Sequence, residues 1–192
     1  MGGTHGHALR RLHWVTGKDL PHGSTDTIQP RRFVGPALRV FDASAESAKN
    51  PDFLVTREWV AAGEATHGKC RVARGCCCAR IGASARVPRS STPTHRVHTR
   101  RFHQDVSAFL AHERDVLGVG VETIGTDAGQ AGSFNPPFPN HGIMHGAGKF
   151  GLASLCNLDR LPATGAVVIA APLKLVNGSG SPLRVIALVP RS

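Results

Sequence analysis

The six consecutive apolar residues 166–171 (AVVIAA) are the feature that most limits how this chain can fold. A continuous apolar run of this length predicts a strand buried on both faces, which lies inside a layered domain. Strand patterns at residues 32–42 and 119–124 alternate with helix patterns at residues 56–68 and 105–117. Strands interspersed with helices indicate an α/β or α+β domain. The 192 residues are enough for one such domain with its own core.

The remaining patterns in the second half are weaker. Residues 144–155 are a helix candidate, and residues 183–189 predict a final strand after the turn signal NGSGS at residues 177–181. Between them, residues 125–139 form a loop rich in glycine and proline that is long enough to suggest a functional role. Asp127 in this loop could face a site, although turn chemistry explains it equally well.

The composition points to a globular protein of the cytoplasm. At 41% hydrophobic residues, the chain is not of the disordered class. No stretch approaches the roughly 20 consecutive apolar residues of a membrane span. The first residues, MGGTH, lack the basic and apolar regions of a secretory signal. We therefore expect a cytoplasmic location.

Most of the net charge of +10 comes from one window, residues 70–101. This window holds eight arginines and no Asp, Glu or Lys, and the rest of the chain has 15 basic against 13 acidic residues. Four of the five cysteines lie in it too. One interpretation is a non-enzymatic, basic module that binds nucleic acid through residues 70–101. Aromatic residues are not interleaved with the arginines, and adjacent cysteines lack the C-x-x-C spacing of zinc or redox motifs, so we favour accidental residues.

Four segments of the second half follow one another in the order found in one enzyme family. They are GVETIGTD (120–127), FNPPFPNH (134–141), LCNLDRLP (155–162) and the PLK and GSGSP-x-R motifs within 171–184. With them the chain resembles the metal-dependent cyclase family, which includes kynurenine formamidases and isatin hydrolases. The resemblance implies an α/β fold, a compact single domain over residues 1–192 with a mixed sheet flanked by helices. It also implies hydrolysis of a carbon–nitrogen bond in an amide, formamide or cyclic amide, a small-molecule partner and a homo-oligomer.

The start of the chain resembles the family's metal-binding signature, H-x-G-T-H-x-D-x-P-x-H. Gly3-Thr4-His5 matches the central G-T-H, and His13 matches the closing histidine. The resemblance implies that His5 and His141 bind a divalent metal, Zn or Mn, and that His13 is the catalytic proton donor to the leaving amine. Imidazole ligands suit these metals, and a bound metal lowers the pKa of its water enough to supply a nucleophile at neutral pH.

This sequence departs from the family pattern at several positions. The first histidine of the signature falls at Met1, and its Asp and Pro are absent. His5 and His13 are eight residues apart, where the family has six. Relatives with two metals have a Glu twelve residues after the later histidine, and that position is Ala153. At best two metal ligands are present, and two ligands rarely hold a catalytic metal tightly. We interpret His145 as a structural or surface residue.

Residues 70–101, which hold the eight arginines, do not match the cyclase family. At the corresponding place the family has a strand followed by a P-H-T-P-like segment. Residues 90–101 can be encoded so that a frame shifted by one base reads FLNANPPGPHTP, and residues 75–84 yield an apolar strand at the same offset. We therefore interpret residues 70–101 as an aberrant, frameshifted segment between residues 1–69 and 102–192. From this we expect a missing central strand, which would leave neighbouring strand edges unpaired. We therefore predict low or no activity.

Overall fold

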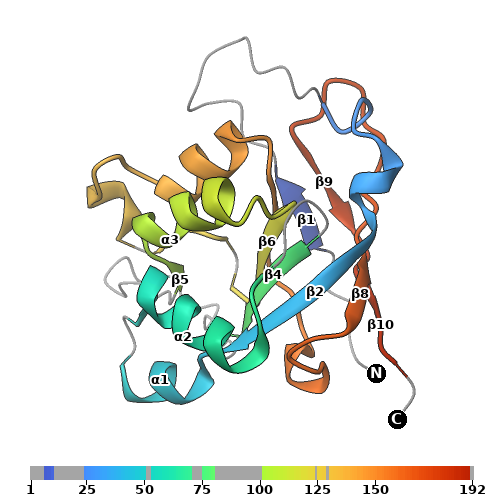
Figure 1. Cartoon of the computed structure of the whole chain (residues 1–192). Helices are drawn as coiled ribbons and strands as arrows, with labels where there is room; N and C mark the ends of the chain where they lie inside the picture. Colours follow the sequence, from blue (N-terminus) through green and yellow to red (C-terminus); the bar gives the residue numbers. More distant parts are fainter. Residues whose placement is uncertain are drawn as a thin grey trace, which may run out of the picture.

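The computed structural model describes residues 7–10, 24–50, 53–70, 75–80, 101–123, 125–128 and 130–190. In these ranges the main element is an eight-stranded mixed sheet (Figure 1) with the strand order β10-β8-β2-β4-β6-β7-β1-β9. Its strands are β1 (His7–Arg10), β2 (Val34–Asp42), β4 (Gly75–Arg80), β6 (Gly118–Val121), β7 (Phe150–Leu152), β8 (Ala166–Ile169), β9 (Gly180–Leu183) and β10 (Ile186–Leu188). A separate parallel pair consists of β3 (Leu54–Val55) and β5 (Arg101–Phe102). The predicted α/β class with a mixed sheet is confirmed.

The centre of the sheet is parallel and its outer parts are antiparallel. Strands β2, β4, β6 and β7 run parallel as successive neighbours. Beyond them, β8 and β10 on one side and β1 and β9 on the other pair antiparallel. Parallel strands need long connections, and helices form part of those connections here.

The two edge strands of the sheet lie close together because only Arg184 and Val185 separate β9 from β10. A bridge between Pro172 and Leu183 also ties the chain after β8 to β9. The sheet therefore curls around an apolar core. That core consists of Phe33, Val40, Phe150, Leu152, Leu155, Leu158, Ala166, Val168, Ala170 and Leu183.

Helices cover the parallel centre of the sheet on its other side (Figure 1). The helices and helical turns are α1 (Ser44–Lys49), α2 (Arg57–His67), α3 (Gln104–Ala108), η4 (Phe109–Glu113), η6 (Asn140–His145) and the short turns η3 (Pro30–Arg32), η5 (Ala131–Ser133) and η7 (Leu158–Arg160). A second core packs Val119 and Val121 of β6 against Val60 of α2 and Leu110 of η4. No helix in the described ranges is long and apolar enough to cross a membrane.

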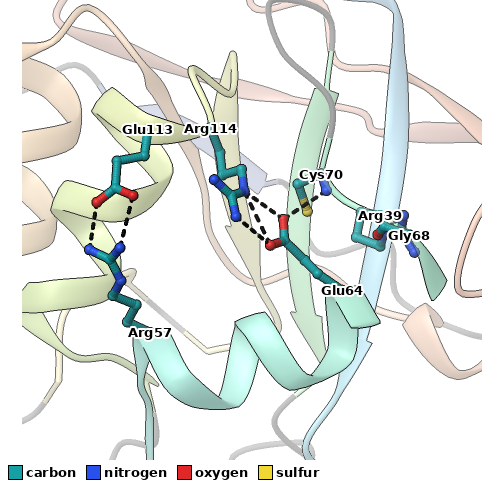
Figure 2. Close-up of polar contacts among 7 residues, drawn as sticks. All are labelled: Arg39, Arg57, Glu64, Gly68, Cys70, Glu113 and Arg114. Atoms are coloured by element: carbon teal, nitrogen blue, oxygen red, sulfur yellow. Dashed lines mark hydrogen bonds and ion pairs between the residues drawn. The ribbon is translucent and has the colours of Figure 1, made fainter. Parts of the chain in front are cut away.

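Helix α2 shows how the sequence sets an element's ends. The Thr56 hydroxyl caps the start by accepting a hydrogen bond from the Trp59 amide at 3.3 Å. Gly68 ends the helix with a φ of 83°, a conformation that favours glycine. Arg39 of β2 then donates to the carbonyls of His67 at 2.8 Å and Gly68 at 2.7 Å (Figure 2). These bonds satisfy carbonyls that a helix end leaves without partners.

Polar contacts also tie α2 to η4 (Figure 2). The carboxylate of the buried Glu64 accepts hydrogen bonds from Arg114 Nε and Nη2, and the shortest distance from each nitrogen is 2.8 Å. It also accepts a hydrogen bond from the Cys70 amide at 2.8 Å. An exposed counterpart joins Arg57 to Glu113. The guanidinium carbons of Arg57 and Arg114 lie 4.8 and 4.2 Å from the ring centre of Phe109.

Three of the expected elements differ from the structure. The helix expected at residues 144–155 ends at His145, because the chain turns at Gly148 with a φ of 70° and continues into β7. The final strand expected at residues 183–189 is split into β9 and β10. Burial along β8 alternates between buried and half-buried residues, so the strand is not buried on both faces as expected.

The expectation of a missing central strand is wrong for residues 75–80. This segment is β4, which pairs in parallel with β2 on one side and β6 on the other. Main-chain pairing needs only backbone amides and carbonyls, which every residue of this segment supplies. At its end, Arg80 forms an ion pair with Asp42 at 2.6 Å. Residues 81–100, on which the frameshift interpretation mostly rests, lie outside the described residues.

Candidate functional site

The structure describes one of the three site residues that the sequence predicts. His141 lies in η6, directly after the glycine- and proline-rich loop. His5 and His13 lie outside the described residues. Of the three predicted site residues, the structure therefore shows the surroundings of His141 alone.

Asp127 is the main contact of His141. Its carboxylate accepts hydrogen bonds from the Asn140 amide at 2.7 Å and the His141 amide at 2.9 Å. The same carboxylate also contacts Nδ1 of the His141 ring. Asp127 is 2% exposed, and a bridge to Phe102 of β5 fixes its position after β6. A carboxylate from one segment thus caps the first turn of a helix in another, where the backbone amides lack partners within the helix.

His145 lies beside His141 in the same helical turn. The two ring centres are 5.4 Å apart in an edge-to-face arrangement. Nδ1 of the buried His145 contacts the Lys149 carbonyl oxygen at 2.9 Å. A Cβ atom at Gly151 of β7 would lie 3.2 Å from His145 Cε1 and 3.5 Å from Thr126 Cγ2, so both side chains pack against bare backbone.

Asn140 connects this group to α3. Its side chain is completely buried and donates a hydrogen bond to Ser107 Oγ at 3.0 Å. Ser107 in turn donates to the His103 carbonyl at 3.2 Å. The start of η6 is therefore held both by Asp127 and, through Asn140, by α3.

The sequence does not place two of these neighbours beside His141 and leaves a third open. The interpretation of His145 as a structural residue agrees with its burial, and its spacing of four from His141, which places two side chains on one helical face, is the signal that could have placed it here. Asn140 gave no signal of its own. For Asp127 the sequence leaves site and turn open, because its contact with His141 joins residues 14 positions apart and no local periodicity describes such a contact.

The described residues do not form a complete metal site. In the part of the chain that the structure describes, no group of three or more His, Cys, Asp or Glu residues could hold an ion. Ala153, at the position where two-metal relatives have Glu, follows β7 and is buried. What the structure provides is a histidine whose ring is bound by a carboxylate on one side, which is an arrangement common among metal-ligating histidines.

Comparisons with known proteins identify the same family. Residues 1–128 match the Cyclase family, described as "Putative cyclase". An isatin hydrolase from Roseibium aggregatum is 43% identical over 94% of this chain and 69% of its own length. The structure of isatin hydrolase A from Labrenzia aggregata, bound to benzyl benzoate, matches with a TM-score of 0.87 at 45% identity, over 96% of this chain and 72% of that one. An isatin hydrolase bound to the product analogue thioisatinate matches with a TM-score of 0.83 at 41% identity, over 97% of this chain and 71% of that one.

The chain therefore belongs to the cyclase family of hydrolases. Within that family it is closely related to the isatin hydrolases and spans about 70% of their length.

Proposed function

We propose that this chain hydrolyses the carbon–nitrogen bond of a cyclic amide of the isatin class. The observation that carries the proposal is 43% identity to an isatin hydrolase over 94% of the chain. A related structure holds thioisatinate, a product analogue, which supports ring opening of a cyclic amide over cleavage of a formamide. The contact of the buried Asp127 with the half-buried His141 supplies a fixed imidazole of the kind such a site needs.

The donor set on the His141 side fits a divalent metal. A histidine ring bound through Nδ1 to a carboxylate keeps Nε2 for a ligand. We propose that His141 and His5 hold the metal, Zn or Mn, which would supply Lewis-acid activation of a water and of the amide carbonyl. His13 would give its proton to the leaving amide nitrogen as the ring opens.

We propose that turnover is low. Ala153 stands where relatives with two metals have a glutamate, and the aspartate of the H-x-G-T-H-x-D signature is absent from this chain. The metal would therefore have fewer protein ligands than in those relatives. Catalytic metal sites normally have three protein ligands. The homo-oligomer remains a prediction, which light scattering of the purified chain tests.

The experiment is ring opening of isatin by the purified chain, followed by chromatography of substrate and product. Reactions contain Zn or Mn, or a chelator, and a parallel series contains a formanilide as the arylformamide. We expect slow opening of isatin that needs the metal, with little cleavage of the formanilide. The proposal is contradicted if the chain, shown by circular dichroism to be folded, opens isatin no faster than the metal does without protein.

A further inference from the structure

We propose that Asp127 is a positioning residue that holds His141 in the tautomer with hydrogen on Nδ1, so that the lone pair on Nε2 is available for a ligand. The role in hydrolysis rests on the proposed function, whereas the tautomer rests on the geometry alone. The inference assigns a role to Asp127, a buried residue that the sequence alone could equally well explain as part of a turn.

The first argument is the chemistry of the contact. An ionised carboxylate only accepts hydrogen bonds. Asp127 Oδ2 faces Nδ1 of His141, so that nitrogen must carry the hydrogen. In a neutral imidazole the other nitrogen then has the lone pair.

The second argument is that the ring is held together with the backbone. Asp127 Oδ2 accepts from both the His141 amide, at 2.9 Å, and the His141 ring. Asp127 Oδ1 accepts from the Asn140 amide at 2.7 Å. One oxygen of Asp127 thus holds both the His141 backbone and the His141 ring, and a ring that turned over would lose its own bond to that oxygen. Asp127 itself is buried and bridged to Phe102, so it does not follow the ring.

A second Asp–His pair in the chain offers a matched comparison. Asp105 Oδ1 contacts His103 Nδ1 at 2.6 Å and accepts from the Val106 amide, also at 2.6 Å. Its two side chains are 35% and 37% exposed, against 13% and 3% for His141 and Asp127. The Asp105 pair is local to the start of α3, so changing it tests the loss of an Asp–His contact away from His141.

Substitution by asparagine separates positioning from simple packing. Asp127→Asn keeps the size of the side chain but replaces one acceptor oxygen by an NH2 donor. The amide can satisfy the backbone amides or the Nδ1 hydrogen, but not all three contacts. An asparagine in place of a histidine-orienting aspartate stabilises the wrong tautomer in known catalytic triads. Asp127→Glu keeps an acceptor-only group and is expected to retain the wild-type tautomer.

The tautomer is measured by long-range ¹H–¹⁵N correlation spectra of the full chain labelled with ¹⁵N-histidine, at about pH 8, above the ordinary histidine pKa of about 6.5. His141→Ala assigns the signals. We expect the Nδ1–H form at His141 in the wild type and in Asp105→Asn, and the Nε2–H form or a mixture in Asp127→Asn. An Nε2–H form in the wild type, which needs no variant to observe, would overturn the proposal, as would an Asp127→Asn spectrum identical to the wild type.

Zinc binding by calorimetry is the second readout. Loss of such a histidine-orienting partner typically weakens metal affinity 10- to 100-fold. We expect a loss of this size in Asp127→Asn and none in Asp105→Asn; equal affinities in the two variants would refute the positioning role. If the wild type shows the expected tautomer but opens no isatin, the proposed function fails while the tautomer assignment stands.

Discussion

Replacing Arg114 by Met tests how much one buried ion pair stabilises this fold. Glu64 lies in α2 with its side chain 4% exposed, and Arg114 follows η4 with its side chain 20% exposed. Burial alone would raise the pKa of Glu64, but the hydrogen bonds from Arg114 and from the Cys70 amide outweigh it, and the pKa is lowered. The pair, which Figure 2 shows, therefore stabilises the folded state because a lowered pKa means that folding favours the ionised Glu64.

Arg114→Met leaves the Glu64 carboxylate buried with the Cys70 amide as its remaining donor among the contacts in Figure 2. Breaking a buried pair from one side costs about 3–5 kcal/mol in general. Water can reach the partly exposed Arg114 position, so we expect a smaller loss of about 2–3 kcal/mol. For a domain of this size, 1 kcal/mol corresponds to roughly 2–4 °C in Tm, so Tm should fall by about 4–12 °C. Urea unfolding and calorimetry measure both quantities.

Arg57→Met is the matched control. Arg57 also pairs with a glutamate through two hydrogen bonds and also lies over the Phe109 ring. Its pair with Glu113 is about half exposed on both sides, and exposed pairs contribute at most about 1 kcal/mol. Met keeps the aliphatic contact with the ring in both variants. Equal losses of 1 kcal/mol or less in the two variants would refute the reasoning from burial.

Three further predictions concern the pH response, the sheet and the metal. Because the pKa of folded Glu64 is lowered, its stabilisation is present above the ordinary value of 4.5 and is lost as the pH falls through the lower folded pKa; Glu64→Gln should flatten acid unfolding curves in that range. A Cβ atom at Gly118 would lie 2.6 Å from Phe150 Cγ, so Gly118→Ala should lower the free energy of unfolding, measured with urea, by about 1–3 kcal/mol. Adding Phe150→Leu to that variant should recover part of this free energy, because the smaller side chain makes room for the new methyl group. Excess Zn should raise the Tm of the wild type by mass action, and a chelator should reverse the rise; an equal rise in His141→Ala would exclude His141 as a ligand.

The parts of the fold that the sequence predicts are those with strong local signals. The strand at residues 34–42 and helix α2 appear close to the expected bounds, because Thr56 and Gly68 mark the helix ends. Strand β7 is not predicted, because its three residues lie inside the stretch expected to be a helix, which the turn at Gly148 ends. Strand β4 was missed because its side chains show no alternation, whereas its pairing is through the main chain.

The candidate site was predictable only where a motif names its residue. His141 stands in the segment that resembles the cyclase family, so the sequence points to it directly. The contacts that hold it come from Asp127, 14 residues earlier, and from Ser107 through Asn140, 33 residues apart. Contacts at such separations depend on how β5, β6 and η6 pack, which no local pattern contains.

The most direct test of this account compares isatin opening by the wild type, His141→Ala and His112→Ala, each with the same metal. His112 is an exposed histidine of η4 and serves as the matched control. We expect His141→Ala to lower the metal-dependent rate 10- to 100-fold or more, and His112→Ala to leave it unchanged. If His141→Ala opens isatin as fast as the wild type, the site is not at His141 and the central claim is wrong.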